Sequence, residues 1–583
     1  MFPDDSSYFL LLHKEKLDVI LSQLRCPLCQ HQSLHVETAD RSMRGFAQKL
    51  KISCSTCTYA NVEYTSPQIE GDANPTRRPY EINHRSVLAS REVGLGHTEL
   101  LKMMAIMNVK GSLHHKTFSS INKHILSRVL YGPAAEVLDT THATVHQLYT
   151  DMHGPCDGPR DITVSFDGTW HIKGHTSSIG VCFAIDAVSG FVLDYIVLSK
   201  YCAECELVGN KLDENDQRLW MEAHKDVCDK NHTGSSGSME VAGAKILWAR
   251  SVEVANFRYT GLLGDGDAAV LEALNTLEPY PGVVISKEEC INHVAKRMFN
   301  ALDRLVKDVN SKVKENKMTL KVQQQVKAEK MKASPKCSTS KGDNKSEALQ
   351  LLTTTMGGRG RMTVARMKKW SSYYRKAIVD SAPDVDAARN AVWAIFFHSI
   401  STLDDPHHTF CAESWCFWKQ AESQGSDPVA AYKEAKHDPP LPKDVAERLV
   451  PIFERLANPE LLKRCMSLQT SNANESLHST VWKRAPKSKY CGKKTVDIAV
   501  AMAVMQFNKG ADALLDAVDS LGLQAGIMLQ NLASKLDARR IKDSDKASLQ
   551  ETKMSRKRKS LAVLQRENQK KTQEGGLYEP GGH

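Results

Sequence analysis

The chain has 583 residues, more than a single hydrophobic core usually accommodates, so we expect several domains. Its formal charge is +9, with 77 Lys and Arg residues against 68 acidic ones, a modest excess that suits polyanion binding and equally suits an ordinary soluble protein. The sequence lacks a run of about 18 apolar residues, and its N-terminus lacks the basic start and apolar core of a signal peptide. These features exclude membrane-spanning and secreted classes, and we expect an intracellular protein with no membrane partner.

The first chemical pattern along the chain is a pair of Cys-x-x-Cys turns. Because the cytosol and nucleus keep thiols reduced, the 15 cysteines are expected to be free thiols or metal ligands. Two such turns place four thiolates around a tetrahedral ion, which predicts a zinc ribbon; the alternative is a set of unligated thiols. A ribbon could recognise DNA ends or form a dimer contact. The ligands would be Cys26, Cys29, Cys54 and Cys57.

Residues 80–153 carry apolar side chains at helical spacing, as in Leu100, Leu101 and Met104. A helical segment ahead of a sheet can bind DNA or can act as a packing buttress. Both interpretations remain open.

Three acidic residues lie in settings that aim their carboxylates at a shared point. Asp167 follows the strand pattern of residues 162–166, and Asp265 follows that of residues 259–264, so each carboxylate is expected at a strand end. Glu475 lies in the first turn of a helix that Ser or Asn can cap. Two aspartates and a glutamate can hold a pair of Mg²⁺ or Mn²⁺ ions, which clamp the attacking and leaving oxygens at a phosphodiester. The pattern indicates cutting or joining of nucleic acid, with Asp267 as the alternative to Asp265.

A second cysteine cluster lies between the first two aspartates. His224 and Cys228 are one helical turn apart, so both can face a Cys-x-x-Cys turn and complete a Cys₃His zinc site; His232 is a competing ligand. The alternative is a buried thiol cluster with an exposed histidine. We expect this segment to be an insertion that braces the sheet edge. Its ligands would be Cys202, Cys205, His224 and Cys228.

A third possible zinc site lies further along the chain. Its residues are surrounded by aromatic side chains, so a core with two hydrogen-bonded histidines is an equal alternative. The residues are His407, His408, Cys411 and Cys416.

These patterns, taken as a set, are similar to those of a known family. Asp167, then Asp265, then Cys290-Ile291-Asn292-His293, then Asn472-Ala473-Asn474-Glu475-Ser476 resembles the Mutator-like (MULE-type) transposases, whose DDE catalytic domain has an RNase H-like fold. Neighbouring segments agree: residues 165–170, 264–267 and 289–294. The resemblance covers roughly residues 80 to 510.

The resemblance implies an α/β protein with an RNase H-like catalytic core. A zinc-binding insertion and a large all-helical insertion would interrupt this core, and a zinc ribbon and a helical domain would precede it. The expected boundaries are 1–66 for the N-terminal zinc ribbon, 80–153 for a helical, DNA-binding domain, 160–300 for the first part of the core with its zinc insertion at 200–235, 301–465 for the helical insertion with a Lys-rich linker, 466–540 for the end of the core and following helices, and 541–583 for a basic, disordered tail.

The resemblance also implies a DNA transposase that cuts transposon ends and joins them to target DNA. Asp167, Asp265 and Glu475 would bind two Mg²⁺ or Mn²⁺ ions, and His293 would donate to a phosphate oxygen or orient water. A structural role for Cys290 and His293, with a buried thiol and a histidine bonded to the backbone, is the alternative. Double-stranded DNA, at least a homodimer on that DNA, and a nuclear location are expected.

Two rival functions remain. One is a host-retained, catalytically inactive DNA-binding protein derived from such a transposase, and the other is a two-metal nuclease of another family. The Lys-rich run of residues 307–345 and the cluster of residues 556–559 are either solvated or disordered stretches, or they serve in DNA contact or nuclear import. Arg359 and Arg361 could donate hydrogen bonds to DNA phosphates.

Overall fold

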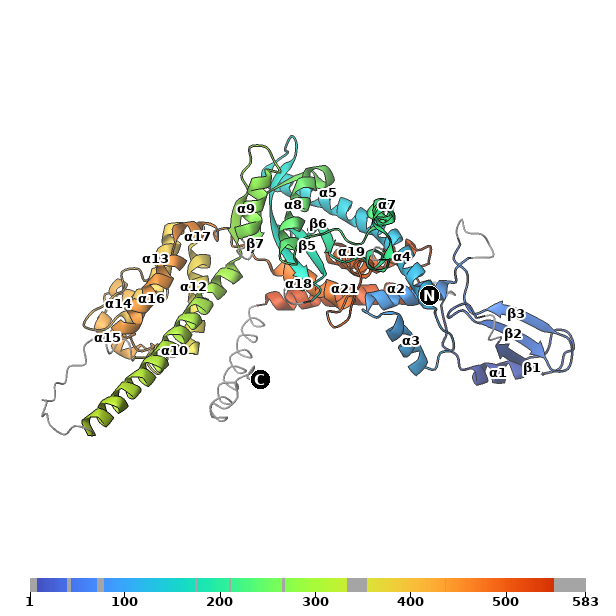
Figure 1. Cartoon of the computed structure of the whole chain (residues 1–583), viewed down its shortest axis with the longest axis horizontal. Helices are drawn as coiled ribbons and strands as arrows, with labels where there is room; N and C mark the ends of the chain where they lie inside the picture. Colours follow the sequence, from blue (N-terminus) through green and yellow to red (C-terminus); the bar gives the residue numbers. More distant parts are fainter. Residues whose placement is uncertain are drawn as a thin grey trace.

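The computed structural model describes residues 8–38, 43–70, 78–172, 176–208, 211–264, 268–332, 354–435 and 437–549. Asp265, Asp267 and the basic cluster 556–559 lie outside these ranges. The described chain has three parts (Figure 1). A small ribbon lies at one end, a unit of helices lies at the other, and a five-stranded sheet with its covering helices lies between them.

The ribbon is a three-stranded antiparallel sheet with one helix packed on it. Its elements are α1 (Lys14–Ser22), β1 (Leu34–Thr38), β2 (Lys49–Cys54) and β3 (Ala60–Tyr64), with the strands in the order β1-β2-β3. In its described part, the buried core consists of Leu21, Leu34, Val36 and two cysteines, Cys26 and Cys54. A core of this size does not stabilise a fold alone, so the ribbon needs a further source of folding energy.

Four helices follow the ribbon and share one core with the end of the described chain. They are α2 (Glu81–Glu92), α3 (His97–Ile106), α4 (His115–Tyr131) and α5 (Pro133–His153). Ile125 and Val129 of α4 lie in the same buried cluster as Ile498 and Met502, which belong to a helix near the other end of the chain. The buried faces of the N-terminal helices therefore brace the C-terminal helices. The C-terminal helices are α19 (Lys493–Lys509), α20 (Ala513–Asp519) and α21 (Ile527–Ser548).

The central sheet has the strand order β6-β5-β4-β7-β8. The first three strands form an antiparallel meander, and the last two run parallel to β4. Every residue of β5 is buried, as expected for an inner strand covered on both faces. The strands are β4 (Arg160–Trp170), β5 (Ile179–Asp186), β6 (Val192–Ser199), β7 (Phe257–Gly264) and β8 (Ser286–Glu289).

Helices cover both faces of this sheet, and alternate strand residues point to each. On one face, Phe166 and Ala184 pack against Trp248 of α8 (Ser238–Ala255), and α9 (Ala268–Leu277) lies in the same layer. On the other face, Val181 and Phe183 pack against α18 (Asn472–Arg484) and α19. Because β4 follows the same alternation, Ser165, Asp167 and Thr169 face α18.

The helices between β8 and α18 form a unit with its own core. The longest of its described helices is α10 (Ile291–Lys332). Lysines 307–332 of the Lys-rich run are therefore part of a helix, and the rest of the run lies outside the described residues. The other members are α12 (Val364–Ser381), α13 (Val385–Ile400), α14 (Phe417–Ser423), α15 (Pro428–Glu434), α16 (Lys443–Leu456) and α17 (Pro459–Lys463).

One arginine of this unit has a structural partner. Arg361 forms an ion pair with Asp444 of α16, so its guanidinium is committed inside the protein. The expectation that both Arg359 and Arg361 are available to phosphates is therefore wrong for Arg361. Arg359 is exposed.

Candidate active site and metal centres

Helix α18 packs along β4, and three of its residues each contact one residue of the strand. The helix residues involved are four apart and the strand residues two apart, so each set lies on one face of its element. Ser165 Oγ donates to Asn474 Oδ1 over 2.5 Å, and Trp482 Nε1 donates to Thr169 Oγ1 over 2.9 Å. Between these two contacts, Nδ1 of His478 lies 3.8 Å from Oδ2 of Asp167.

Asp167 lies inside β4 rather than at its end. The strand continues to Trp170 because Thr169 and Trp170 pair with Val181 and Gly180 of β5. Our expectation of a strand-end carboxylate is therefore wrong. The side chain is 39% exposed, so it remains accessible although it starts from the middle of a strand.

Glu475 directly follows the buried Asn474 in α18. Its side chain is 60% exposed, whereas Asn474 is 0% exposed, so the helix buries one neighbour and presents the other. Nε2 of His293, at the start of α10, lies 3.6 Å from Oε1 of Glu475. Helix α18 therefore carries both Glu475, which His293 contacts, and His478, which contacts Asp167.

Cys290 has a different role from His293. It is buried, and its sulfur accepts hydrogen bonds of 3.3 Å from both the backbone N–H and the hydroxyl of Ser471, which precedes α18. The thiol therefore fastens the beginning of α18 to the beginning of α10. Of the two interpretations of the Cys-x-x-His segment, the structural one fits Cys290, while the ring of His293 faces a carboxylate.

The second predicted aspartate, Asp265, and its alternative, Asp267, lie outside the described residues. The preceding strand β7 ends at Gly264 and runs parallel to β4, with Leu263 opposite Ser165. The end of β7 therefore lies beside the part of β4 that leads into Asp167.

His478 was not foreseen from the sequence. Burial lowers the pKa of its imidazole to about 4, and the positive charge of Lys487 adds to this effect. The ring is therefore neutral at pH 7. It brings no positive charge to Asp167, so it would not repel a cation at this carboxylate. Helical spacing from Asn474 could have drawn attention to His478, but its contact with β4 requires the packed structure.

The four ribbon cysteines converge as predicted. The sulfur atoms of Cys26 and Cys57 are 3.6 Å apart, as are those of Cys29 and Cys54, and all four lie within 4.8 Å of one another. A tetrahedral zinc ion with Zn–S bonds of about 2.3 Å would separate its sulfur ligands by about 3.8 Å. The cluster therefore has the dimensions of a Cys₄ zinc site.

The surroundings of Cys54 favour the thiolate that zinc requires. The hydroxyl of Ser33, 3.0 Å away, is the largest influence that lowers the pKa of this thiol to about 5, and the backbone N–H of Thr56 contributes over 3.3 Å. Zinc binds thiolates rather than thiols.

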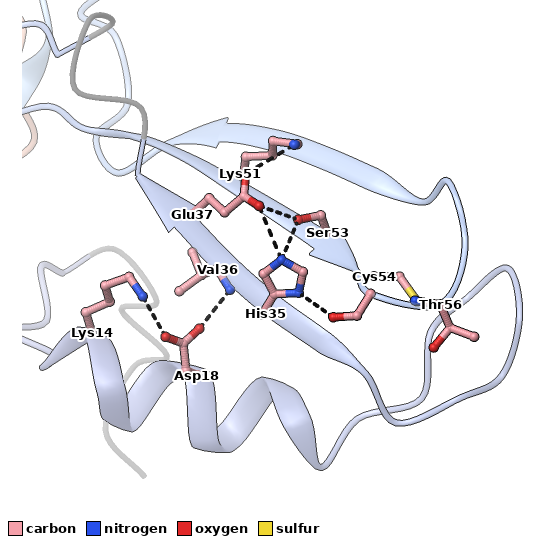
Figure 2. A network of polar contacts seen from close by, with 10 residues as sticks. Lys14, Asp18, His35, Val36, Glu37, Lys51, Ser53, Cys54 and Thr56 are labelled. Carbon is pink, nitrogen blue, oxygen red and sulfur yellow. Dashed lines mark hydrogen bonds and ion pairs between the residues drawn. The ribbon is translucent and has the colours of Figure 1, made fainter.

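Polar contacts fasten α1 and the strands around this cluster (Figure 2). Asp18 of α1 accepts hydrogen bonds from the backbone N–H of Val36 and from Lys14. On β1, Nε2 of His35 lies 3.3 Å from Glu37 and 3.2 Å from Ser53. These contacts join α1 to β1, and β1 to β2, the strand that ends at Cys54.

The second cysteine cluster also assembles. Cys202 Sγ lies 3.3 Å from His224 Nε2, and Cys205 Sγ lies 3.5 Å from Cys228 Sγ. His224 Nδ1 lies 3.5 Å from Glu204, an outer contact of the kind that orients metal-binding histidines. The competing ligand His232 instead contacts Ser235 and Ser238, each over 3.1 Å. Cys202 directly precedes α6 (Ala203–Val208), which carries Cys205. His224 ends α7 (Glu214–His224), and Cys228 follows the 3₁₀ helix η4 (Lys225–Val227).

Asn231, shortly after Cys228, covers one edge of the central sheet. Asn231 accepts a hydrogen bond from the backbone N–H of Ser199 and donates one to the carbonyl of Val197, both on β6. Strand β6 is an edge strand, and such edges need a cover that occupies their backbone groups. Asn231 therefore braces this edge of the sheet.

The third cluster differs from our expectation in one ligand. His398 of α13, rather than His407, lies with His408, Cys411 and Cys416. His407 contacts Asp405 over 2.9 Å instead.

Comparison with known families identifies the family of the chain. A sequence model described as Mutator-like transposase matches residues 9–416. The chain belongs to the Mutator-like transposase family. Membership implies DNA binding and a role in transposition. No curated protein and no solved structure shows significant similarity to the chain.

The family match includes some candidate site residues and not others. Asp167, His293 and the ribbon of this Mutator-like transposase lie within residues 9–416, whereas Glu475 and the rest of α18 follow that range. In the described part of the chain, no helix is long and apolar enough to span a membrane.

Proposed function

We propose that this Mutator-like transposase cuts transposon ends and joins them to target DNA with a DDE active site formed by Asp167, Asp265 and Glu475. The observation that carries the proposal is the register of α18 on β4. Glu475 and His478 lie on the same turn of α18, and His478 contacts Asp167 of β4. The carboxylates of Asp167 and Glu475, which come from distant parts of the chain, therefore face the same region.

The donor atoms suit hard divalent cations. Carboxylate oxygens are the ligands that Mg²⁺ and Mn²⁺ prefer, and β7 ends one residue before Asp265, with Asp267 as the alternative ligand. Two such ions, held by these three acids, would activate the attacking water or 3′-hydroxyl and stabilise the departing 3′ oxygen.

His293 would act beside these acids. Its Nε2 already faces Glu475 at 3.6 Å, and the Cys290 contact with Ser471 fastens the helix start that carries it. From this position the imidazole can donate a proton to a phosphate oxygen or orient a water molecule.

The architecture supports an RNase H-like catalytic core. An antiparallel meander followed by two parallel strands linked through a helix is the strand order expected for that fold, and α18 covers the face that bears Asp167. We propose that residues 160–300 and 466–540 form this core and that residues 301–465 are an insertion. The N-terminal ribbon (1–66), the helical segment (80–153) and the basic tail (541–583) would complete the chain.

Two zinc ions belong to the same proposal. The Cys26/Cys29/Cys54/Cys57 and Cys202/Cys205/His224/Cys228 clusters have dimensions that suit structural zinc. The protein would act in the nucleus, on double-stranded transposon ends and target DNA, as at least a dimer.

The test compares full-length protein with its Asp167→Ala and Glu475→Ala variants. The substrate is a duplex bearing the terminal inverted repeat that flanks the coding sequence, and nicking is measured with and without Mg²⁺. Both variants should lose Mg²⁺-dependent nicking by at least about 100-fold while they retain DNA binding in fluorescence polarisation. Glu447→Ala, which removes an acid of α16, should cut like the unsubstituted protein.

Two results would contradict the proposal. Normal nicking by either variant would remove that acid from the site. Binding without nicking by the unsubstituted protein would favour a host-retained, inactive DNA-binding protein.

A further inference from the structure

A buried cluster of two histidines and two cysteines lies in the helical unit, far along the chain from the acids and from the other cysteine clusters. His398 belongs to α13, and His408, Cys411 and Cys416 belong to residues 401–416, which connect α13 to α14. Cys416 is 0% exposed, His408 is 4% exposed and Cys411 is 9% exposed. Burying these polar and nucleophilic atoms together is unfavourable unless each of them has a binding partner.

The spacing of the four donor atoms is that of a tetrahedron. Nδ1 of His398 lies 3.2 Å from Nδ1 of His408. Cys411 Sγ lies 3.6 and 3.7 Å from these two nitrogens, and Cys416 Sγ lies 3.9 and 3.5 Å from them. Ideal tetrahedral zinc would separate two nitrogens by about 3.4 Å and a nitrogen from a sulfur by about 3.6 Å.

A hydrogen-bonded core histidine explains these distances less well. A proton shared by two imidazoles needs only the two rings. Here both sulfur atoms also lie within 3.9 Å of both nitrogens, so all four donors surround one point. A single cation at that point accounts for the whole set.

The outer contacts of His408 are those of a metal ligand. Its Nε2 lies 2.9 Å from the hydroxyl of the buried Ser401, which also accepts a hydrogen bond from the backbone N–H of His407. Because Nε2 is engaged by this hydroxyl, Nδ1 is left to face the cluster. Such an outer partner fixes the tautomer and the orientation of histidines that bind metal.

Aromatic side chains enclose the cluster. Trp418 stacks on His408 with ring centroids 4.9 Å apart, and Trp415 and Phe417 lie 5.1 and 5.4 Å from the ring of His398. Four protein ligands inside an apolar shell leave no open coordination position. This arrangement is typical of structural rather than catalytic zinc.

We propose that His398, His408, Cys411 and Cys416 bind a third, structural zinc ion. The ion would fasten residues 401–416 to α13 and fix the point where α14 begins. Tetrahedral sites with two nitrogen and two sulfur ligands favour zinc over Mg²⁺ or Mn²⁺, so this site is chemically separate from the acids. The inference does not depend on the proposed DNA chemistry.

The test is the zinc content of purified full-length protein, measured by mass spectrometry of the metal. His398→Gln should lower the content by about one zinc ion per chain relative to the unsubstituted protein. His398→Cys should restore it, because a thiolate can replace the imidazole. The control is His407→Gln, which removes the neighbouring histidine that contacts Asp405 and should leave the zinc content unchanged.

A second measurement serves if His398→Gln does not fold. The zinc X-ray absorption spectrum of the unsubstituted protein should show a larger fraction of imidazole nitrogen among the zinc ligands than the Cys₄ and Cys₃His clusters alone would give. Equal zinc content in folded His398→Gln and unsubstituted protein would overturn the proposal, as would an imidazole share no larger than that of those two clusters.

Discussion

Ser165 in β4 donates a hydrogen bond of 2.5 Å to Asn474 in α18, which lies 309 residues later in the chain. Both side chains are almost completely buried, so this contact sets the register between the strand that carries Asp167 and the helix that carries Glu475. A shift of α18 by one residue would turn Glu475 away from the region that it shares with Asp167.

The contact should be measurable as a coupling energy. Asn474→Ala leaves the Ser165 hydroxyl buried without its partner, which should lower the free energy of unfolding by about 1–3 kcal/mol. In the double variant with Ser165→Ala, the loss should be less than the sum of the two single losses, by about 1 kcal/mol. Denaturant unfolding of the four proteins gives this cycle, and additive losses would show that the two side chains do not interact.

The identity of the second acid can be decided by a pair of substitutions. We expect Asp265→Ala to abolish Mg²⁺-dependent nicking and Asp267→Ala to reduce it less, since Asp265 follows β7 directly. Both variants should bind the transposon-end duplex. If the effects are reversed, the metal ligand is Asp267.

The cysteine clusters of the ribbon and of the sheet edge should lose zinc independently when a ligand of one of them is replaced. Cys26→Ser should remove about one zinc ion per chain and unfold the ribbon, whose own core is small, while the central sheet remains folded. Cys205→Ser should remove about one zinc ion and lower the melting temperature of the sheet. Metal analysis and limited proteolysis distinguish the two results, and unchanged zinc content in either variant would exclude that cluster.

His84 in α2 should make the protein sensitive to acid. Burial, and secondarily the neighbouring His124, lowers its pKa to about 4 from an ordinary value near 6.5. Between these two pH values the unfolded chain binds a proton that the folded chain does not, so the free energy of unfolding falls as the pH falls from 6.5 to 4. The full effect is on the order of 3 kcal/mol.

Thermal unfolding across this pH range tests the assignment. His84→Phe should lose less stability between pH 6.5 and pH 4 than the unsubstituted protein. The exposed His13→Phe is the matched control, and it should keep the original pH dependence. A His84→Phe curve parallel to the original would show that another group is responsible.

The exposed lysines of α10 provide a test of DNA binding. If the helix lies along DNA, replacing Lys312, Lys314 and Lys317 with Gln should make the salt dependence of binding shallower, by about 0.9 in log–log slope for each phosphate that is no longer neutralised. Glutamine favours helix nearly as well as lysine, so α10 should persist. Preference for the transposon end should survive, because phosphate contacts carry no base information. An unchanged slope would mean that these lysines only face solvent.

The sequence predicts local features well and packed relationships poorly. The cysteine sets of the first two clusters can be predicted because each ligand lies in a short, regular pattern. His398 cannot, because it lies near the end of an apolar helix and joins the third cluster only through the fold of residues 401–416. The position of Asp167 differs from the prediction because the end of β4 depends on its pairing with β5, which adds Thr169 and Trp170 to the strand.

The helix that completes the site is separated from the sheet by a long interval, since Ser471 lies 181 residues after Cys290. At about 5–20 residues per second, a ribosome needs roughly 10–40 s to make that interval. During this time the apolar face of β5 that contains Val181 and Phe183 lacks its covering helices, α18 and α19. The nascent protein would therefore expose this apolar face to chaperones, and the proposed site could not form until α18 has been made.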